Sequence, residues 1–165
     1  MIRIAFLACA DTLPGPGPRR GDAFEHDLKI AALRPAFEAA GLDLIEIDWR
    51  APLEAFDGAA LVLLGTAWDY QDYPQDFLAK LDVLAARGIT VCNPPEIVRW
   101  NADKGYLLDL SERDVPVIPT VWHEDAGRAE IADALDRFQT DRVVVKRRVG
   151  AGALGQHSFS RDALP

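Results

Sequence analysis

The chain has 165 residues, of which 49% are hydrophobic, a size that buries roughly 70% of the unfolded surface and suffices for one domain and part of a second. Its formal net charge of −8 at pH 7 opposes binding to polyphosphate backbones, which argues against nucleic acid as a partner and favours small anions held by a few placed cations. No apolar run reaches the roughly 20 residues of a membrane span, and residues 1–10 lack the features of a signal peptide, so we expect a cytoplasmic protein without a membrane partner.

The first half of the chain alternates between strand and helix patterns. In chain order, we expect a strand at residues 2–9, a proline- and glycine-rich loop at 11–21, a helix at 22–41, strands at 42–49 and 59–64, a helix at 75–87 and a strand at 89–92. This alternation predicts an α/β fold with a mainly parallel sheet flanked by helices. In such a sheet, ligands bind beyond the carboxyl ends of the strands, where the loops at 11–21 and 66–73 are expected.

The helix at residues 22–41 carries local signals of its own. Asp22 and Glu25 have the spacing of a capping box, which predicts the start of the helix. Leu28 and Leu33 follow the helical repeat, and Pro35 is expected to kink the helix or to restart it.

A break in the pattern at Asn93-Pro94-Pro95 predicts a domain boundary near Pro95, with domains at residues 1–95 and 96–165. Beyond it, Asn101 is expected to cap a helix that carries Lys104 in its first turn. Another helix is predicted around Ile131 and Leu135, followed by a strand at 142–146, a glycine-rich loop and a returning strand at 156–159.

Two lysines in the second domain predict a nucleotide phosphate site. Lys104 stands near the expected helix start, and Lys146 ends the strand that leads into the glycine-rich loop. A cation combined with backbone N–H groups of a glycine-rich loop can approach phosphate oxygens closely. The expected ATP-binding residues are Lys104, Lys146, Gly150, Ala151, Gly152 and Gly155.

Each of these signals also has a purely structural interpretation. The glycines alone are compatible with a simple hairpin turn, and either lysine with an ordinary exposed side chain. Cys9 and Cys92 are interpreted as reduced, buried single thiols, and His26, which lies in a helix without a partner pattern, receives no catalytic role.

The second half of the chain resembles the start of an ATP-grasp enzyme, the superfamily of ATP-dependent carboxylate–amine ligases that includes glutathione synthetase. The resemblance rests on Asn101-Ala-Asp-Lys104, on the extended segment that ends in Pro119-Thr120, and on Lys146 with the glycine-rich loop at 150–155. It implies that residues 96–165 are an incomplete N-terminal lobe of the nucleotide-binding domain, with ATP and Mg²⁺ as cofactors. The family's metal ligands are expected beyond residue 165, so no metal ligand is assigned here.

The first domain resembles the smaller Rossmann-like domain that precedes the ATP-grasp module. The motif at residues 65–70 is similar to that of a subgroup that includes O-ureido-serine cyclo-ligase. By this resemblance, Asp11, Trp68, Asp69 and Tyr70 face an amino-acid-like substrate, with an acidic group for its ammonium and aromatic rings for its shape. The alternative for Trp68 is packing on the domain surface.

We therefore expect the N-terminal portion of an ATP-dependent carboxylate–amine or cyclo-ligase that acts through an acyl phosphate, while the 165-residue chain alone is expected to be inactive. Such chemistry consists mostly of positioning and charge neutralisation. The alternative is a non-catalytic small-molecule-binding or interaction domain with a vestigial nucleotide lobe. A homo-oligomer stays open. An NAD-type Rossmann enzyme is excluded, because no G-x-G-x-x-G motif follows the first strand.

Overall fold

The computed structural model describes residues 1–150 and 152–165, which form two compact units. The first unit comprises Met1–Trp100 and the second Asn101–Pro165. The division falls within helix α3 (Pro95–Ala102).

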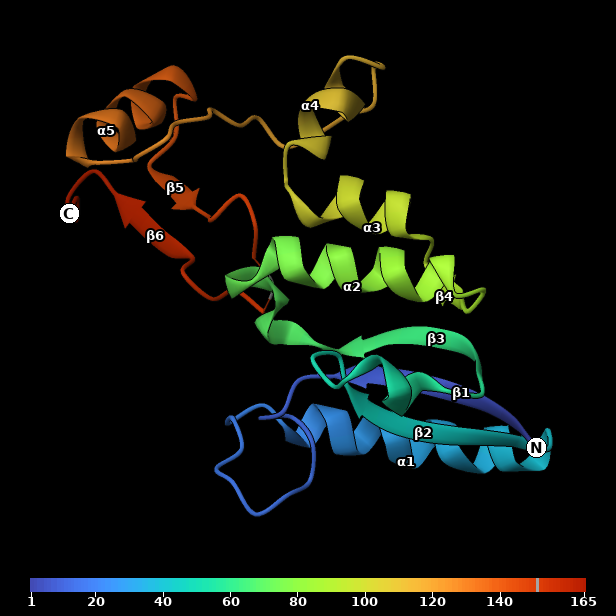
Figure 1. Cartoon of the computed structure of the whole chain (residues 1–165). Coiled ribbons are helices and arrows are strands. Elements are labelled where there is room, and N and C mark those ends of the chain that lie inside the picture. Colours follow the sequence, from blue (N-terminus) through green and yellow to red (C-terminus); the bar gives the residue numbers. More distant parts are fainter. Residues whose placement is uncertain (151) are drawn as a thin grey trace. The chain divides into compact units, whose positions relative to one another are not determined.

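A four-stranded parallel sheet forms the centre of the first unit (Figure 1). Its strands are β1 (Ile2–Ala8), β2 (Leu42–Asp48), β3 (Ala59–Thr66) and β4 (Thr90–Cys92), in the order β2-β1-β3-β4. Strand β1 is buried on both faces, which explains its nearly continuous apolar sequence. The α/β fold predicted from the sequence is confirmed, and all four strands agree with their predicted positions to within two residues at each end.

Two long helices cover opposite faces of this sheet. They are α1 (Phe24–Ala39) and α2 (Pro74–Ala86). Successive residues of a strand point to opposite faces, so β1 contributes to two separate hydrophobic clusters. Ile4 and Phe6 pack with Ile30 of α1, whereas Ala5 and Leu7 pack with Phe77, Leu81 and Leu84 of α2.

Details of α1 differ from the prediction. The capping box is wrong: Ala23 occupies the N-cap without a side-chain hydrogen bond, and the Asp22 carboxylate instead pairs with Arg20 at 2.5 Å. Pro35 lies inside one continuous helix, so no restart occurs. The buried face carries His26 and Ile30, while Leu28 is exposed because the helix presents a different side to the sheet.

The second unit contains two helices and a hairpin-like pair of strands. They are α4 (Tyr106–Ser111), α5 (Arg128–Arg137), β5 (Arg142–Val145) and β6 (His157–Ser160). The two strands pair antiparallel, and α5 buries Ile131, Ala134 and Leu135, so the predictions for this helix and both strands are confirmed.

The predicted helix starting at Asn101 is wrong. Asn101 lies near the end of α3, and a turn at residues 103–105 separates α3 from α4. The physical reason is local competition for the backbone: the Asp103 carboxylate accepts a 2.7 Å hydrogen bond from the Gly105 N–H, and Asp103 forms an isolated antiparallel bridge with Val149.

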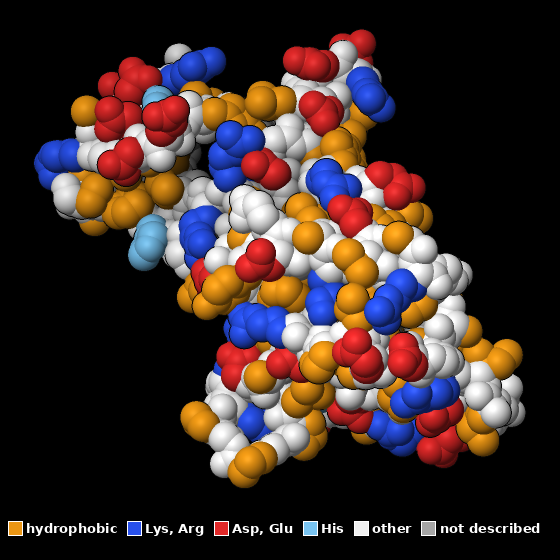
Figure 2. Space-filling view, in the orientation of Figure 1, with side chains coloured by type: hydrophobic (Ala, Val, Ile, Leu, Met, Phe, Trp, Pro, Cys, Tyr) orange, Lys and Arg blue, Asp and Glu red, His pale blue; other side chains and the backbone are white. Residues whose placement is uncertain are grey.

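In the part of the chain that the structure describes, no helix combines the length and apolar character required to cross a bilayer. Lys and Arg side chains are interspersed with Asp and Glu side chains on the face that Figure 2 shows.

Candidate functional site

The strand order of the first unit defines a crevice. The chain passes from β1 to β2 on one side and then to β3 on the other side of β1. In parallel sheets, such a reversal leaves a ligand-sized crevice beyond the carboxyl ends of the two strands that flank it, here β1 and β3. Ala8 pairs with Thr66 at this end, so the segments with Asp11 and with Trp68, Asp69 and Tyr70 both begin here.

Asp69 is held by two side chains that follow β2. Its Oδ1 accepts a 2.6 Å hydrogen bond from Trp49 Nε1, and its Oδ2 lies 2.5 Å from Arg50 Nη2. Burial raises the pKa of Asp69 above its ordinary value, the Trp49 hydrogen bond and Arg50 lower it, and the charge of Asp11 raises it again. Asp69 therefore has a partner on each oxygen and lies close to a second carboxylate.

Asp11 has the opposite character. Its Oδ1 atom is buried and finds no hydrogen-bond partner among the described residues. The pKa of the neighbouring Cys9 thiol is raised, chiefly by burial and further by Asp11. An unsatisfied buried acceptor costs about 1–3 kcal/mol, so Asp11 is prepared to accept a donor from outside the chain.

Trp68 and Tyr70 have different surroundings, although both belong to the 3-10 helix Trp68–Asp72. The Trp68 ring lies beneath two cations, with Lys29 Nζ at 4.9 Å and the Arg20 guanidinium carbon at 5.1 Å from its centroid. Tyr70 packs against Phe77 of α2 at a centroid distance of 5.3 Å, and burial raises its pKa. Trp68 therefore combines an aromatic face with positive charge, whereas Tyr70 mainly extends the core.

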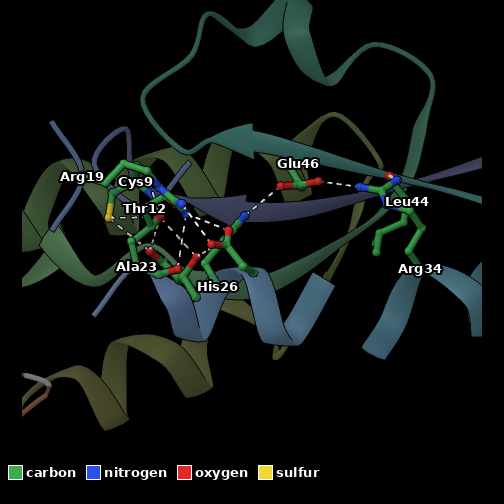
Figure 3. A network of polar contacts seen from close by, with 10 residues as sticks. Cys9, Thr12, Arg19, Ala23, His26, Arg34, Leu44 and Glu46 are labelled. Atoms are coloured by element: carbon green, nitrogen blue, oxygen red, sulfur yellow. Dashed lines mark hydrogen bonds and ion pairs between the residues drawn. The ribbon is translucent and has the colours of Figure 1, made fainter. Parts of the chain in front are cut away.

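Sequence analysis missed a buried polar network at this end of the sheet (Figure 3). His26 is fully buried, with Nδ1 at 2.6 Å from Thr66 Oγ1 and Nε2 at 2.8 Å from Glu46 Oε2. The only signal in the sequence was Glu46, an acidic residue that shares the α1-facing side of β2 with buried Leu44. Such a position requires a partner, which nothing in the sequence identifies.

In the second unit, the structure brings the predicted nucleotide residues together. Lys104 Nζ donates to the carbonyl oxygen of Gly150 at 2.9 Å, and the Lys104 N–H donates to the carbonyl oxygen of Arg148 at 2.9 Å. Partial burial lowers the pKa of Lys104, and the nearby positive charge of Lys146 lowers it further. Lys104 thus lies at the start of the glycine-rich loop, within the electrostatic influence of Lys146.

The glycine-rich loop has the backbone conformations that glycine favours. Gly152 and Gly155 adopt positive φ angles of 61° and 67°. The predicted site residue Ala151 lies outside the described residues. Arg148, at the start of the loop, is fixed by an ion pair to Asp103, with Nη2 at 3.0 Å from Oδ1.

The cysteine prediction is only partly correct. Both thiols are free, but Cys9 is buried whereas Cys92 is exposed, because β4 is short and lies at the sheet edge. Among the described residues, no group of three or more His, Cys, Asp or Glu side chains is arranged to hold a metal ion.

Comparison with known families decides the affiliation of the first unit. The family model of the D-cycloserine synthetase DcsG N-terminal domain matches residues 4–93, which is more than half of the chain. The chain belongs to this family. The residues that match the DcsG N-terminal domain include most of β1, all of β2, β3 and β4, and the helices α1 and α2.

Two individual proteins extend this comparison. The cycloserine biosynthesis protein DcsG of Streptomyces lavendulae is 31% identical over 96 residues, an alignment that covers 57% of this chain and 31% of that protein. The crystal structure of D-cycloserine synthetase DcsG superposes with a TM-score of 0.76 at 24% identity, covering 97% of this chain and 51% of that one. The chain thus spans about half the length of that solved relative, with which it shares the fold.

Proposed function

We propose that this chain forms the N-terminal part of an ATP-dependent carboxylate–amine or cyclo-ligase, of the ATP-grasp type, that acts on a small amino-acid-like substrate through an acyl phosphate. The observation that carries the proposal is the position of the Lys104 ammonium at the start of the glycine-rich loop, 2.9 Å from the Gly150 carbonyl oxygen, where burial and the charge of Lys146 lower its pKa. Membership of the DcsG N-terminal domain family supports a ligase-related role for the first unit.

The residues in the second unit fit a polyphosphate. A phosphate group would relieve the repulsion between Lys104 and Lys146, and a charge-assisted hydrogen bond to each is worth about 1.5–3 kcal/mol. The loop glycines allow backbone N–H groups to approach phosphate oxygens. ATP would supply the phosphoryl group that activates the substrate carboxylate, and Mg²⁺ would accompany it, with its protein ligands still expected beyond residue 165.

On the substrate side, we assign the ammonium group to Asp11. Its unpaired Oδ1 belongs to the segment that follows β1, and Trp68 belongs to the segment that follows β3, so both border the crevice between these strands. Asp69, with Trp49 and Arg50 on its two oxygens, borders the same crevice from the segment after β3. Tyr70 supports this wall through Phe77. D-cycloserine, which the names of the relatives mention, carries a primary amine that suits such a site.

One observation favours the alternative, a small-molecule-binding domain with a vestigial nucleotide lobe. The Lys104 ammonium already donates to the Gly150 carbonyl and lies 3.4 Å from the Arg148 carbonyl. In a vestigial lobe these contacts would be permanent, whereas in a nucleotide site they would be exchanged for phosphate oxygens.

Calorimetric titration with ATP separates the two functions. We expect Lys104→Met and Lys146→Met each to weaken ATP binding at least tenfold, as loss of a charge-assisted bond requires. Arg137→Gln removes an exposed cation of the same unit and is expected to leave affinity unchanged. Binding of D-cycloserine without any ATP binding would refute the ligase assignment and favour the binding domain.

A second titration tests the substrate assignment. Asp11→Asn should weaken D-cycloserine binding at least tenfold, whereas Asp43→Asn, at the opposite end of β2, should leave it unchanged. The same ring without its amino group, isoxazolidin-3-one, should bind wild type and Asp11→Asn equally. If both ligands bound wild type more tightly than they bound Asp11→Asn, an ammonium contact would be contradicted.

A further inference from the structure

We propose that His26 is a positioning residue that holds Asp11 at a fixed place relative to Trp68 and Asp69. This inference rests on the proposed substrate site and names the group that sets its geometry. His26 lies on α1, beneath the sheet, and reaches the two ligand-facing segments through hydroxyl groups rather than by direct contact.

His26 is a fully buried side chain that is surrounded by polar contacts. The side chain is completely buried, yet both ring nitrogens have partners, one on β2 and one on β3. The ring of Phe6 packs edge-on against it at a centroid distance of 5.6 Å. Burying an imidazole costs desolvation free energy unless each nitrogen has a hydrogen-bond partner. An apolar side chain would fill this volume without that cost. Its contribution therefore lies in the orientation of its partners.

The direction of the hydrogen bonds follows from Glu46. Its carboxylate can only accept, so His26 Nε2 carries the proton and donates to it. Arg34 holds Glu46 in place through an ion pair and also donates to the Leu44 carbonyl at 2.9 Å. In the neutral imidazole, Nδ1 is then the acceptor, and the Thr66 hydroxyl donates to it.

Thr66 then connects His26 to the segment that carries Asp11. The Thr66 carbonyl accepts hydrogen bonds from the Cys9 N–H at 3.2 Å and from the Cys9 thiol at 3.1 Å. Thr12 Oγ1 donates to the Cys9 carbonyl at 2.8 Å and lies 3.3 Å from Thr66 Oγ1. Asp11 is thus enclosed between two anchored residues, Cys9 and Thr12, while Trp68 and Asp69 follow directly after Thr66 on the other segment.

Loops beyond a sheet are otherwise the least restrained part of such a fold. A ligand site requires its groups within about 0.5 Å of the productive position. Arg19 provides a second restraint from the loop itself, with Nη2 at 2.5 Å from the Thr12 carbonyl oxygen. The hydroxyl of Thr66 is therefore one link through which α1 and β2, by way of His26 and Glu46, reach the start of both ligand-facing segments. It acts beside the contacts of Arg19 with Asp27 of α1 and of Trp49 with Asp69.

Hydrogen exchange of the ligand-free chain tests this link. Thr66→Val removes the hydroxyl at constant shape, and we expect the amides of residues 9–13 and 67–71 to exchange at least tenfold faster through local opening. Thr66→Ser retains the hydroxyl and should leave the rates within about twofold. Ile30→Val, which trims a buried neighbour on α1 outside the network, is the control for general loosening. Equal acceleration by Thr66→Val and Ile30→Val would overturn the proposal.

Three further measurements make the result specific. Long-range proton–nitrogen spectra should show His26 as the Nε2–H tautomer, and an Nδ1–H tautomer would overturn the assigned direction. His26→Asn keeps an acceptor near Nδ1 and should retain more of the loop protection than His26→Leu. D-cycloserine affinity should fall tenfold or more in Thr66→Val and recover in Thr66→Ser. If wild type binds no D-cycloserine, the substrate assignment fails, while the exchange rates still decide the role of His26.

Discussion

The indole nitrogen of Trp49 donates a 2.6 Å hydrogen bond to Oδ1 of Asp69 and so joins the ends of β2 and β3. Trp49 is almost completely buried and packs edge-on against Phe77 of α2. The bond stabilises the ionised form of a carboxylate whose burial alone would favour its protonated form.

Trp49→Phe should therefore raise the pKa of Asp69 further and destabilise the chain by about 1.5–3 kcal/mol at pH 7, where Asp69 is ionised. The cost should shrink as pH falls through the raised pKa of Asp69, because the protonated carboxyl needs the donor less. Urea unfolding at several pH values measures this. A destabilisation independent of pH would show that lost packing with Phe77, and not the hydrogen bond, is responsible.

Asp69→Asn tests the same site from the other side. Because burial raises the folded-state pKa of Asp69, the wild-type chain loses stability as pH rises from about 4 through that raised pKa. The amide cannot titrate, so this part of the pH dependence should disappear in Asp69→Asn. Unfolding curves that keep the wild-type pH dependence in this range would contradict the assignment.

The sequence allowed the sheet to be predicted because each strand of the first unit is a contiguous apolar segment bounded by turn residues. The side of α1 that faces the sheet could not be predicted in the same way. His26 is buried there while Leu28 is exposed, since a set of hydrogen bonds to Glu46 and Thr66 outweighs the hydrophobic repeat. Partners of this kind meet only in three dimensions.

Gly65 lies where β3 passes very close to β1. A Cβ atom at this position would lie 2.1 Å from the ring of Phe6 and 2.6 Å from the carbonyl oxygen of Leu7. Gly65→Ala should destabilise the chain by about 3 kcal/mol, because neither the packed ring nor the strand backbone can move freely. Gly15→Ala is the matched control, since its Cβ would meet nothing within 4 Å. Equal unfolding midpoints for the two variants would contradict this close contact.

Lys104 and Lys146 are electrostatically coupled. Burial and the charge of Lys146 lower the pKa of Lys104, so Lys104 should lose its proton at a lower pH than an ordinary lysine. Lys146→Met removes one of these causes and should shift the Lys104 titration to higher pH, as measured by carbon NMR of its ε-methylene. An unchanged midpoint would mean that the two ammonium groups lie too far apart to share a phosphate.

If both lysines bind ATP, affinity should fall as pH rises through the lowered pKa of Lys104. Neutral lysine retains hydrogen-bonding capacity but loses the charge that attracts phosphate. Titration of ATP affinity between pH 7 and 10 tests this. Phosphate binding itself should raise the pKa of Lys104, so the decline should begin at the pKa of the free chain and end at the higher pKa of the complex.

Asp103 should control the start of the glycine-rich loop. Its carboxylate accepts from the Gly105 N–H and pairs with Arg148, and both side chains are partly exposed. We expect Asp103→Ala to cost only about 1 kcal/mol in stability but to accelerate exchange of the Lys104 amide, which donates to the Arg148 carbonyl. Asp133→Ala on α5 is the control. Unchanged exchange at Lys104 would show that the loop is held by other contacts.

Lys104 lies at the glycine-rich loop because Asp103 bridges to Val149 and the Lys104 N–H donates to the Arg148 carbonyl oxygen. The predicted substrate residues separated into different roles, since both oxygens of Asp69 have partners in Trp49 and Arg50, while the buried Oδ1 of Asp11 has none among the described residues. That difference depends on neighbours from β2, which the spacing of residues in the sequence does not reveal.

The two outer strands of the sheet also disfavour edge-to-edge strand pairing between copies of the chain. Strand β2 is an edge strand and carries Asp43, Glu46 and Asp48, while the opposite edge, β4, spans only Thr90–Cys92. Two β2 strands meeting edge to edge would place like charges side by side, and three residues offer little backbone for a new strand to join. The same sheet that presents the crevice is thus protected against growing into an aggregate.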